Sequence, residues 1–483
     1  MPVADCRRRA HHPPHRRAYP LRPECRSLCS LRCIGPLSGS HAQRARGQHQ
    51  CPVSVSGGRH FAVREPVSRA GQHDGSTHDG EPTVAKFHHG TRVTETTDLG
   101  DAINDIDSSV IGVICTADDA DDETFPLDTP VLLTRVASVL GKAGTTGTLL
   151  TTLTAISNQC SPKVVVVRVA DADNATPDSS NEDAPTQDKL VIGGQTKDGR
   201  YTGMYALLTA VQKVGVSPRI LAVPGLDTES VATELQVFAE KLKAFAYVSA
   251  YGCKSVSEAK KYAANLTGRE LMVIWPDFEA YDSATGKTGV IPAPAVAVGL
   301  RAKIDDETGW HKSISNVAIS GVTGMTHDVY FSLEDTDSDT DDLNQACVTT
   351  IIKRDGYRLW GNRTRDEDTY IFEVYTRTAQ MLRVMVAEAH AKYVDGPLTP
   401  SFAKAVVDGV NQKLSALTTA DRLLGGTAWY DTTENSKDTL RQGKITVKYN
   451  YTPVPPAEDI EFIQDFTDTW FDVFDTAATS SGS

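Results

Sequence analysis

The chain has 483 residues and a formal net charge of −13, with 49 Lys and Arg against 62 Asp and Glu. This length exceeds one ordinary compact core and predicts two or three domains. No apolar run approaches the roughly 20 residues of a membrane-spanning helix, so we expect no membrane anchoring. The acidic balance disfavours nucleic acid and anionic lipid as broad-surface partners, because both carry negative charge.

Residues 1–86 differ in composition from the rest of the chain. They hold 14 Lys and Arg against 6 Asp and Glu, whereas residues 87–483 hold 35 against 56. This segment is rich in Arg, His, Cys and Pro and has no apolar period, so we expect a basic, disordered extension. We interpret it as an upstream reading extension, with the natural start at Val84. The intact mass of the native subunit tests this interpretation.

Other interpretations of this extension have less support. Cys25, Cys29 and Cys33 lack the paired spacing of a tetrahedral zinc site, and no apolar stretch of secretory-signal length is present. A basic nucleic-acid arm remains an alternative. The other cysteines are scattered, which is typical of buried thiols in a reducing compartment: Cys115, Cys160, Cys253 and Cys347.

Residues 87–107 are predicted to form an extended N-terminal arm. The sequence from Phe87 to Asp98 is polar, favours β-structure and has little to bury, so it needs a partner to become ordered. We expect Phe87, His88 and Val93 to contact that partner.

Two segments, residues 108–170 and 190–333, are predicted to be α/β. Short apolar runs alternate with helical periods, which is typical of a mainly parallel, covered sheet and indicates a Rossmann-like α/β core. The expected strands are Ser109–Cys115, Pro130–Thr134, Lys163–Val169, Arg219–Val223, Phe245–Ala250 and Leu271–Trp275. The expected helices are Leu149–Gln159, Thr228–Lys243 and Ser255–Asn265.

Acidic segments at residues 171–189 and 334–347 are predicted to be surface linkers, because they hold few large apolar side chains. Residues 348–443 should then form a strand-rich and helical C-terminal domain, α+β when taken with the rest. Its expected strands are Val348–Ile352 and Tyr357–Trp360, and its expected helices, each with an apolar stripe, are Tyr370–Lys392 and Pro400–Leu417.

Residues 444–474 are predicted to be a strand followed by a C-terminal arm. Ile445, Val447 and Tyr449 alternate with polar residues, as in a half-buried edge strand. After a proline-rich turn, large apolar residues follow that are unsuited to water, with a period that fits either a helix or a strand. The adhesive residues expected here are Ile460, Phe462, Phe466 and Trp470, and residues 475–483 are expected to be a flexible tail.

Motifs that bind phosphate or metal are absent or incomplete. Residues 141–148 resemble a phosphate loop but miss its spacing, so a turn with a Thr cap is the better interpretation. Asp335, Asp337 and Asp339 resemble a calcium loop that lacks its Gly and its final Glu. We therefore expect no cofactor and no metal.

A catalytic constellation is also not evident. Asp277 and Glu279 follow a strand, where α/β enzymes place catalytic groups, but no partner motif accompanies them. An α/β hydrolase or oxidoreductase is kept as an alternative, as is a monomeric binding module, although two adhesive ends argue against the latter.

Several stretches, taken in order, carry a resemblance to one known family: FHHGTRVTE (87–95), SSVIGVICTADDAD (108–121), FPLDTPVLLT (125–134), VVVVRV (164–169), DGRYTGMYALL (198–208), SPRILAVPG (217–225), ISNVAISGVTGM (314–325), DGYRLWGNRT (355–364) and ITVKYNYTPVPPAEDIEF (445–462). Together they resemble the contractile phage tail sheath family, and in particular the sheaths of P2-like myophages. The resemblance runs from about residue 87 to 474.

The resemblance implies a structural protein and not an enzyme. Its copies would stack as hexameric rings around a tail tube and contract to drive the tube through a host envelope, with both arms adding strands to neighbours. Implied partners are further copies, the tail tube, baseplate and tail terminator proteins. The implied location is the virion tail, after assembly in the bacterial cytoplasm. The sheath of an R-type bacteriocin or secretion-like injection device stays open as an alternative.

Overall fold

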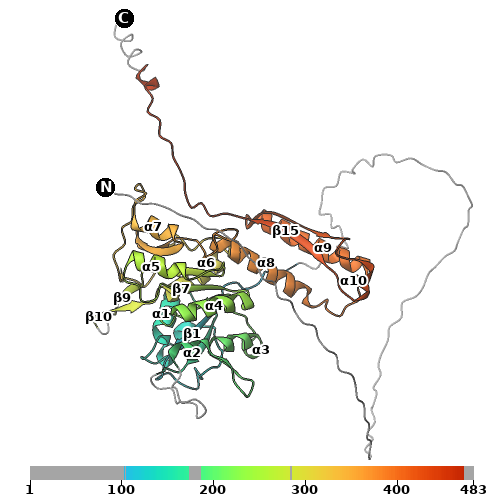
Figure 1. Cartoon of the computed structure of the whole chain (residues 1–483), viewed down its shortest axis with the longest axis horizontal. Helices are drawn as coiled ribbons and strands as arrows, with labels where there is room; N and C mark the ends of the chain where they lie inside the picture. The colour runs from blue at the N-terminus through green and yellow to red at the C-terminus, as the bar shows by residue number, and fades with distance from the viewer. Residues whose placement is uncertain (1–102, 104, 173–185, 283–285, 473–483) are drawn as a thin grey trace, which may run out of the picture. The chain divides into compact units, whose positions relative to one another are not determined.

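The computed structural model describes residue 103 and residues 105–172, 186–282 and 286–472 (Figure 1). Its central element is an eight-stranded sheet in the order β13-β12-β8-β7-β6-β1-β3-β2. The six inner strands pair in parallel, whereas β2 and β13 pair antiparallel at the two edges. The strands are β1 (Ile111–Thr116), β2 (Val131–Leu133), β3 (Val164–Val169), β6 (Ile220–Ala222), β7 (Phe245–Ser249), β8 (Leu271–Ile274), β12 (Val348–Lys353) and β13 (Tyr357–Trp360).

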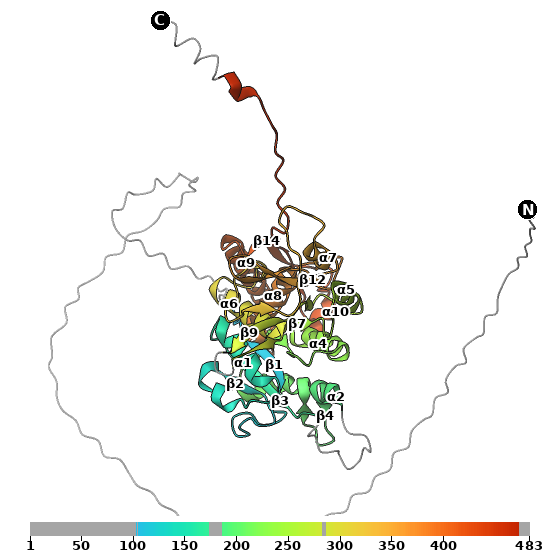
Figure 2. The same ribbon diagram turned by 90° about the vertical axis from the view of Figure 1, so that its left-hand side faces the viewer.

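Helices cover both faces of this sheet (Figure 2). Along β1, Ile111 and Val113 enter the core on one face and Ile114 enters the core on the other. The first face packs on α1 (Leu149–Gln159) and α6 (Ala293–Glu307). The second packs on α4 (Glu229–Leu242), α5 (Val256–Ala264), α7 (Asp339–Gln345), the 3₁₀ helix η3 (Gly203–Thr209) and the short α2 (Gln187–Ile192) and α3 (Ala210–Val214). Burial on both sides explains why these strands are continuous apolar runs.

The sequence analysis did not predict α6, because residues 293–302 of this helix are buried on all sides and show no apolar stripe. Its Gly299 permits a close approach to α1, since a Cβ atom there would lie 3.0 Å from the Cα of Ile156. A side chain at this position would push the two helices apart by a few tenths of an ångström, so glycine suits their contact.

Three smaller sheets lie outside the central one. One has the order β10-β9-β11, with β9 (Phe278–Asp282), β10 (Lys287–Ile291) and β11 (Gly324–Met325). Another pairs β4 (Gly194–Gln195) with β5 (Tyr201–Thr202). The third pairs β14 (Leu423–Tyr430) with β15 (Val447–Pro453) in the C-terminal part.

The C-terminal part has its own apolar core. Two long helices, α8 (Glu373–Ala391) and α9 (Pro400–Thr419), pack with the hairpin β14–β15, and a short α10 (Lys437–Arg441) lies in the connection between its strands. The buried side chains of this core include Met381, Met385, Val410, Leu414 and Leu417.

A buried ionic network joins α8 to α6 and the sheet. Arg301 Nη2 lies 2.7 Å from Asp305 Oδ1, and Arg301 Nη1 lies 3.2 Å from Glu373 Oε1. Arg377 pairs with Asp305, and the Tyr247 hydroxyl donates to Glu373. All four charged side chains are fully buried and balance as two cations and two anions, so each ion depends on the others.

The predicted strands and helices named above are present within a few residues of their expected bounds, and the mixed α/β character is confirmed. One correction concerns the acidic linker predicted at residues 334–347. It contains α7, which Ser338 caps by accepting from the backbone N–H of Asp341, and Leu343 is buried. Acidic residues in a first helical turn are favourable, so they marked a helix start there and not a linker.

Strands that the sequence assigned to three segments belong to one sheet. β1 pairs with both β3 and β6, and β12 pairs with β8. β12 and β13, predicted in the C-terminal domain, therefore complete the edge of the α/β sheet. The predicted division of the chain did not include this long-range pairing.

Candidate assembly interface

The hairpin β14–β15 lies on the C-terminal helices. β14 packs along α9, and Leu423 and Ala428 of β14 are buried in the apolar core of the C-terminal part. Val447, Tyr449 and Tyr451 of β15 pack against the same core, and the two tyrosine rings lie 6.3 Å apart. Burial raises the pKa of both tyrosines, which keeps their hydroxyls neutral. The helices therefore hold one face of the hairpin in place.

The outer edges of this hairpin have no further strand among the described residues. On β14, the Asn411 side chain binds the backbone N–H and C=O of Ala428 at 2.7 and 2.9 Å. The outer backbone groups of Ala428 are therefore already hydrogen-bonded and cannot pair with another strand. β15 offers the longer uninterrupted edge, and unpaired backbone groups of this kind accept another strand.

The connection between β14 and β15 is closed by polar contacts. The buried Asn435 accepts from the Thr446 N–H at 2.7 Å and donates to the Thr446 carbonyl at 2.7 Å. Lys448 pairs with Asp431 at 2.6 Å and with Glu434 at 3.1 Å. The hydrogen bond from Lys448 is the largest cause that lowers the pKa of the Asp431 carboxyl to about 2. These contacts therefore fix the connection that carries α10 against the first residues of β15.

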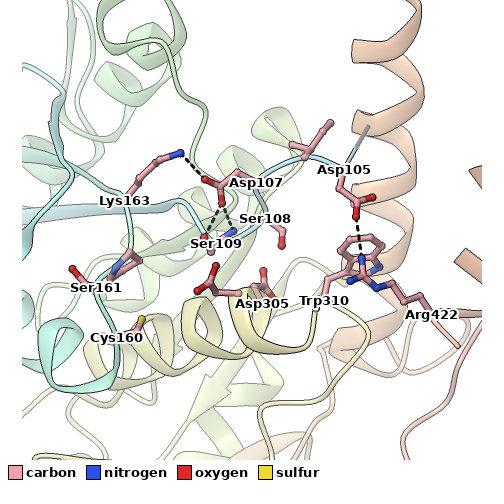
Figure 3. A pocket seen from close by; sticks show the side chains of 14 residues that line it. Asp105, Asp107, Ser108, Ser109, Cys160, Ser161, Lys163, Asp305, Trp310 and Arg422 are labelled. Atoms are coloured by element: carbon pink, nitrogen blue, oxygen red, sulfur yellow. Dashed lines mark hydrogen bonds and ion pairs between the residues drawn. The ribbon is translucent and has the colours of Figure 1, made fainter. Parts of the chain in front are cut away.

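Residues 105–109 line one side of a polar pocket of about 510 Å³ between the sheet and the C-terminal part (Figure 3). Asp107 Oδ2 lies 2.9 Å from Lys163 Nζ. Asp105 pairs with Arg422 at 3.3 Å, and the Arg422 guanidinium lies 5.0 Å from the Trp310 ring centroid. Asp105 also pairs with Lys413 of α9 at 2.5 Å.

These ion pairs hold residues 105–107 against two parts of the molecule. One is Lys163, directly before β3, and the other is Lys413 and Arg422 of the C-terminal part. Partial burial of Asp105 opposes ionisation, but hydrogen bonds and charges from Lys413 and Arg422 outweigh it and lower the pKa of this carboxyl. Partial burial likewise opposes ionisation of Asp107, but hydrogen bonds from Lys163 and Ser109 outweigh it and lower the pKa of this carboxyl. At neutral pH both carboxylates are charged and paired, so the pocket anchors the end of the predicted N-terminal arm, residues 105–107.

After Pro453 the chain leaves the hairpin as an extended trace, which Figures 1 and 2 show running away from β15. We call residues 454–472 the tail. Its regular structure is the 3₁₀ helix η4 (Thr469–Asp472). Arg363 holds its beginning through two hydrogen bonds to Glu458, at 2.8 and 2.7 Å. Beyond that pair the large side chains are exposed: Ile460 66%, Phe462 88%, Ile463 86%, Phe466 89%, Trp470 76% and Phe471 60%.

The predicted arm residues fall into three groups. Phe87, His88 and Val93 lie outside the described residues. Ile445, Val447 and Tyr449 are half-buried on or beside β15. Ile460, Phe462, Phe466 and Trp470 lie together on the exposed tail. Their role in contacts between subunits stays a prediction, and the tail takes neither of its two predicted periods along most of its length.

Sequence reasoning missed two features of this region. β14 was not predicted, because Gly425 and Gly426 interrupt its apolar pattern. The Arg363–Glu458 pair joins residues 95 positions apart, and no local pattern signals such a contact. Among β14 side chains, Leu424 is 61% exposed and Trp429 is 40% exposed, so this strand adds apolar surface to the interface.

The loop that resembles a phosphate site is filled by the chain itself. Asp119 accepts from the backbone N–H groups of Thr145 and Thr146 at 2.7 and 3.0 Å and from their hydroxyls. These hydrogen bonds, chiefly those from Thr146, lower the pKa of Asp119. The expected Thr cap differs as well, since Thr148 accepts from the Thr116 N–H instead of capping α1.

The carboxylates that follow strands are engaged in structure. Asp277 accepts from the backbone N–H of Ala293 at the start of α6, at 2.8 Å, and burial raises its pKa. Asp227 accepts from the Ser249 N–H and hydroxyl, and burial raises its pKa to about 7. Within the described ranges, no group of three or more His, Cys, Asp or Glu is placed to hold a metal, and no helix is long and apolar enough to cross a membrane.

Family models of tail sheath proteins match most of the described chain. The phage tail sheath protein central domain matches residues 199–365, and the phage tail sheath C-terminal domain matches residues 366–467. The tail sheath protein Gp18 domain III N-terminal region matches residues 108–169. The major tail sheath protein of Serratia phage KSP20 is 56% identical over 386 residues, which cover 80% of this chain and 97% of that protein. The chain belongs to the phage tail sheath family.

Other members of the sheath family agree with this assignment. The tail sheath protein of Escherichia phage P2 is 45% identical over 399 residues, 82% of this chain and 100% of that protein. The resemblance noted from sequence is therefore confirmed, and with it the role of a tail sheath protein.

Solved sheath structures show the same fold at low sequence identity. The helical sheath of the anti-feeding prophage in its contracted state has a TM-score of 0.59 at 18% identity and covers 78% of this chain and 98% of that one. The contracted sheath complex of the extracellular contractile injection system PVC has a TM-score of 0.57 at 17% identity, covering 80% and 99%.

Proposed function

We propose that this chain is the structural subunit of a contractile phage tail sheath whose copies polymerise as stacked hexameric rings around a tail tube. Contraction of the sheath drives the tube through the host envelope for genome delivery. The observation that carries the sheath role is 45–56% identity to two phage tail sheath proteins over nearly their whole length. The injection-system sheaths share the fold at 17–18% identity, so the phage tail is favoured over the injection device.

Polymerisation is supported by the hairpin and the tail together. A strand added to β15 would form main-chain hydrogen bonds that are independent of side-chain identity. Such a link survives while the packed bodies of neighbouring copies rotate and exchange their side-chain contacts. Because one copy's tail engages a different surface on the next copy, the contact is heterologous and propagates as a helix.

The subunit acts without chemistry of its own in this proposal. The carboxylates at the ends of strands, Asp227 and Asp277, bind backbone groups, and the loop at residues 144–148 binds Asp119. The energy of contraction comes from better subunit interfaces in the contracted state, so no nucleotide is required. We propose the tail tube, baseplate and tail terminator proteins as partners, the virion tail as location, and assembly in the bacterial cytoplasm.

Electron microscopy of the full chain with and without its tail tests this proposal. Deletion of residues 454–483 removes the tail and leaves β15 in place, which deletion from Lys444 would not. We expect the full chain, expressed with tail tube protein, to form striated tubes, and the deletion to give soluble, folded subunits. A chain lacking only residues 475–483 is the matched control and should still form tubes. Soluble monomers from all three chains would contradict the proposal.

A further inference from the structure

An apolar groove lies beside α10 in the C-terminal part. Its volume is about 560 Å³, and side chains from the start of α9, the end of β14, α10 and the residues before β15 line it. The apolar lining residues are Leu398, Ala403, Val407, Tyr430, Leu440 and Ile445, all of them partly exposed. A groove of this size accommodates one or two large side chains.

We propose that this groove binds the tail of a second copy, with apolar side chains from Ile460 to Ile463 seated in it. The inference rests on the proposed function, because it names the surface that receives the tail during assembly. It differs from strand addition, since it supplies side-chain specificity at the end of the hairpin connection.

Exposed surface on the tail matches the groove in chemistry. Phe462 and Ile463 are each more than 85% exposed and follow one another. Burial of an aromatic or branched side chain away from water is favourable. The tail thus carries the apolar anchors that the groove is shaped to cover.

The tail is acidic, and an excess of basic side chains lies beside the groove. Residues 457–472 hold six Asp and Glu and no Lys or Arg. Residues 437–444 hold Lys437, Arg441 and Lys444 against the single acid Asp438, which pairs with Arg441. In the lining itself, Lys404 and Asp408 pair with each other. The basic excess of residues 437–444 favours association with the acidic tail.

Geometry assigns the groove to another copy's tail. The Arg363–Glu458 pair holds the tail near Phe372, which directly precedes α8. The groove begins past the other end of α8, at Leu398, and a helix of 19 residues spans about 28 Å. The five residues that follow Glu458, as far as Ile463, reach at most about 18 Å. While this pair is formed, these anchors therefore reach only the groove of a neighbour.

Photo-crosslinking in mixed assemblies of the full chain tests the inference. Copies labelled with ¹⁵N carry p-benzoylphenylalanine in place of Phe462, and unlabelled copies carry the natural residue. After irradiation, we expect peptides that join a labelled tail to residues 398–408 or 430–445 of an unlabelled copy. Val407→Glu or Ile445→Glu in the unlabelled copy should lower this yield about tenfold, because a charge in the apolar groove disfavours docking.

Val211→Glu is the matched control. Val211 is 51% exposed on α3, outside the groove, so the crosslink yield should stay within about twofold. Thermal unfolding of each variant separates lost docking from lost folding. Tubes whose crosslinks stay within one copy, or reach other peptides, would overturn this inference and leave the proposed function intact. Absence of tubes from the natural chain would instead count against the proposed function.

Discussion

The central sheet and the tail use the same residue types in opposite ways. Phe238, Phe245 and Phe278 in the sheet region are at most 1% exposed, whereas Phe462 and Phe466 in the tail are 88% and 89% exposed. Burial of apolar surface stabilises the first group within one chain. The second group is stabilised only when a partner covers it. One region of the molecule therefore folds for itself, and the other is built for assembly.

Breaking the buried ionic network should have the largest effect on folding. Arg377→Met leaves Asp305 buried beside a single cation, and removing one partner of such a network costs about 3–5 kcal/mol. We expect the free energy of unfolding in urea to fall by that amount. Lys260→Met, which breaks the exposed Lys260–Asp342 pair, is the control and should change it by less than about 1 kcal/mol. Equal effects of the two would contradict the role assigned to the network.

A matched pair of phenylalanine substitutions tests the comparison directly. Phe245→Ala should lower the free energy of unfolding by about 3–5 kcal/mol, because it leaves a cavity under the sheet. Phe466→Ala should change it by less than about 0.5 kcal/mol but should reduce the yield of tubes seen by electron microscopy. A loss of subunit stability from Phe466→Ala would show that the tail packs on its own body.

The buried Asp227 predicts a pH dependence of the folded body. Burial raises the pKa of its carboxyl to about 7, against about 3.9 in an unfolded chain. The folded protein therefore keeps a proton that the unfolded chain releases between about pH 4 and 7. The free energy of unfolding should fall as pH rises through this window. Asp227→Asn should flatten the slope, measured by urea unfolding at several pH values, and an unchanged slope would rule out this assignment.

The smallest expected effect concerns the pair that directs the tail. Arg363→Ala removes both hydrogen bonds to Glu458. The Arg363 and Glu458 side chains are 37% and 33% exposed. The free energy of unfolding should change by at most about 1 kcal/mol. Tail mobility should increase, measured by NMR relaxation of a label placed at residue 466. Lys260→Ala, which breaks an exposed ion pair outside the groove, is the control. An unchanged mobility would show that the pair does not set the direction of the tail.

Local patterns anticipated much of the body. Runs such as VVVVRV (164–169) predict strands because both of their faces are covered, and the bounds of α1 were predicted without error. Helix α6 was missed, because burial on all sides removes the stripe on which such predictions rely. The acidic run at residues 334–342 was predicted to be a linker, but its last residues form the first turn of the helix α7.

The candidate interface was only partly visible in sequence. Alternation in Val447–Tyr451 indicated a half-buried strand, and the aromatic residues after Pro456 indicated an adhesive segment. Three features share no local sequence pattern. They are the partner strand β14, the groove beside α10, and the hydrogen bond that the Asn411 side chain donates to the Ala428 carbonyl. Predicting them requires knowledge of which elements pack together.

The sequence by itself determined the family, the covered strands, the long helices and the unprotected apolar tail, because each of these is written in local composition and period. Only the tertiary structure decided that three predicted segments share one sheet, that four buried ions join α6 and α8, and that Arg363 holds the tail at Glu458. Such contacts depend on distances between residues far apart in the chain. Their energies arise only after the long-range packing has brought the groups together and excluded water.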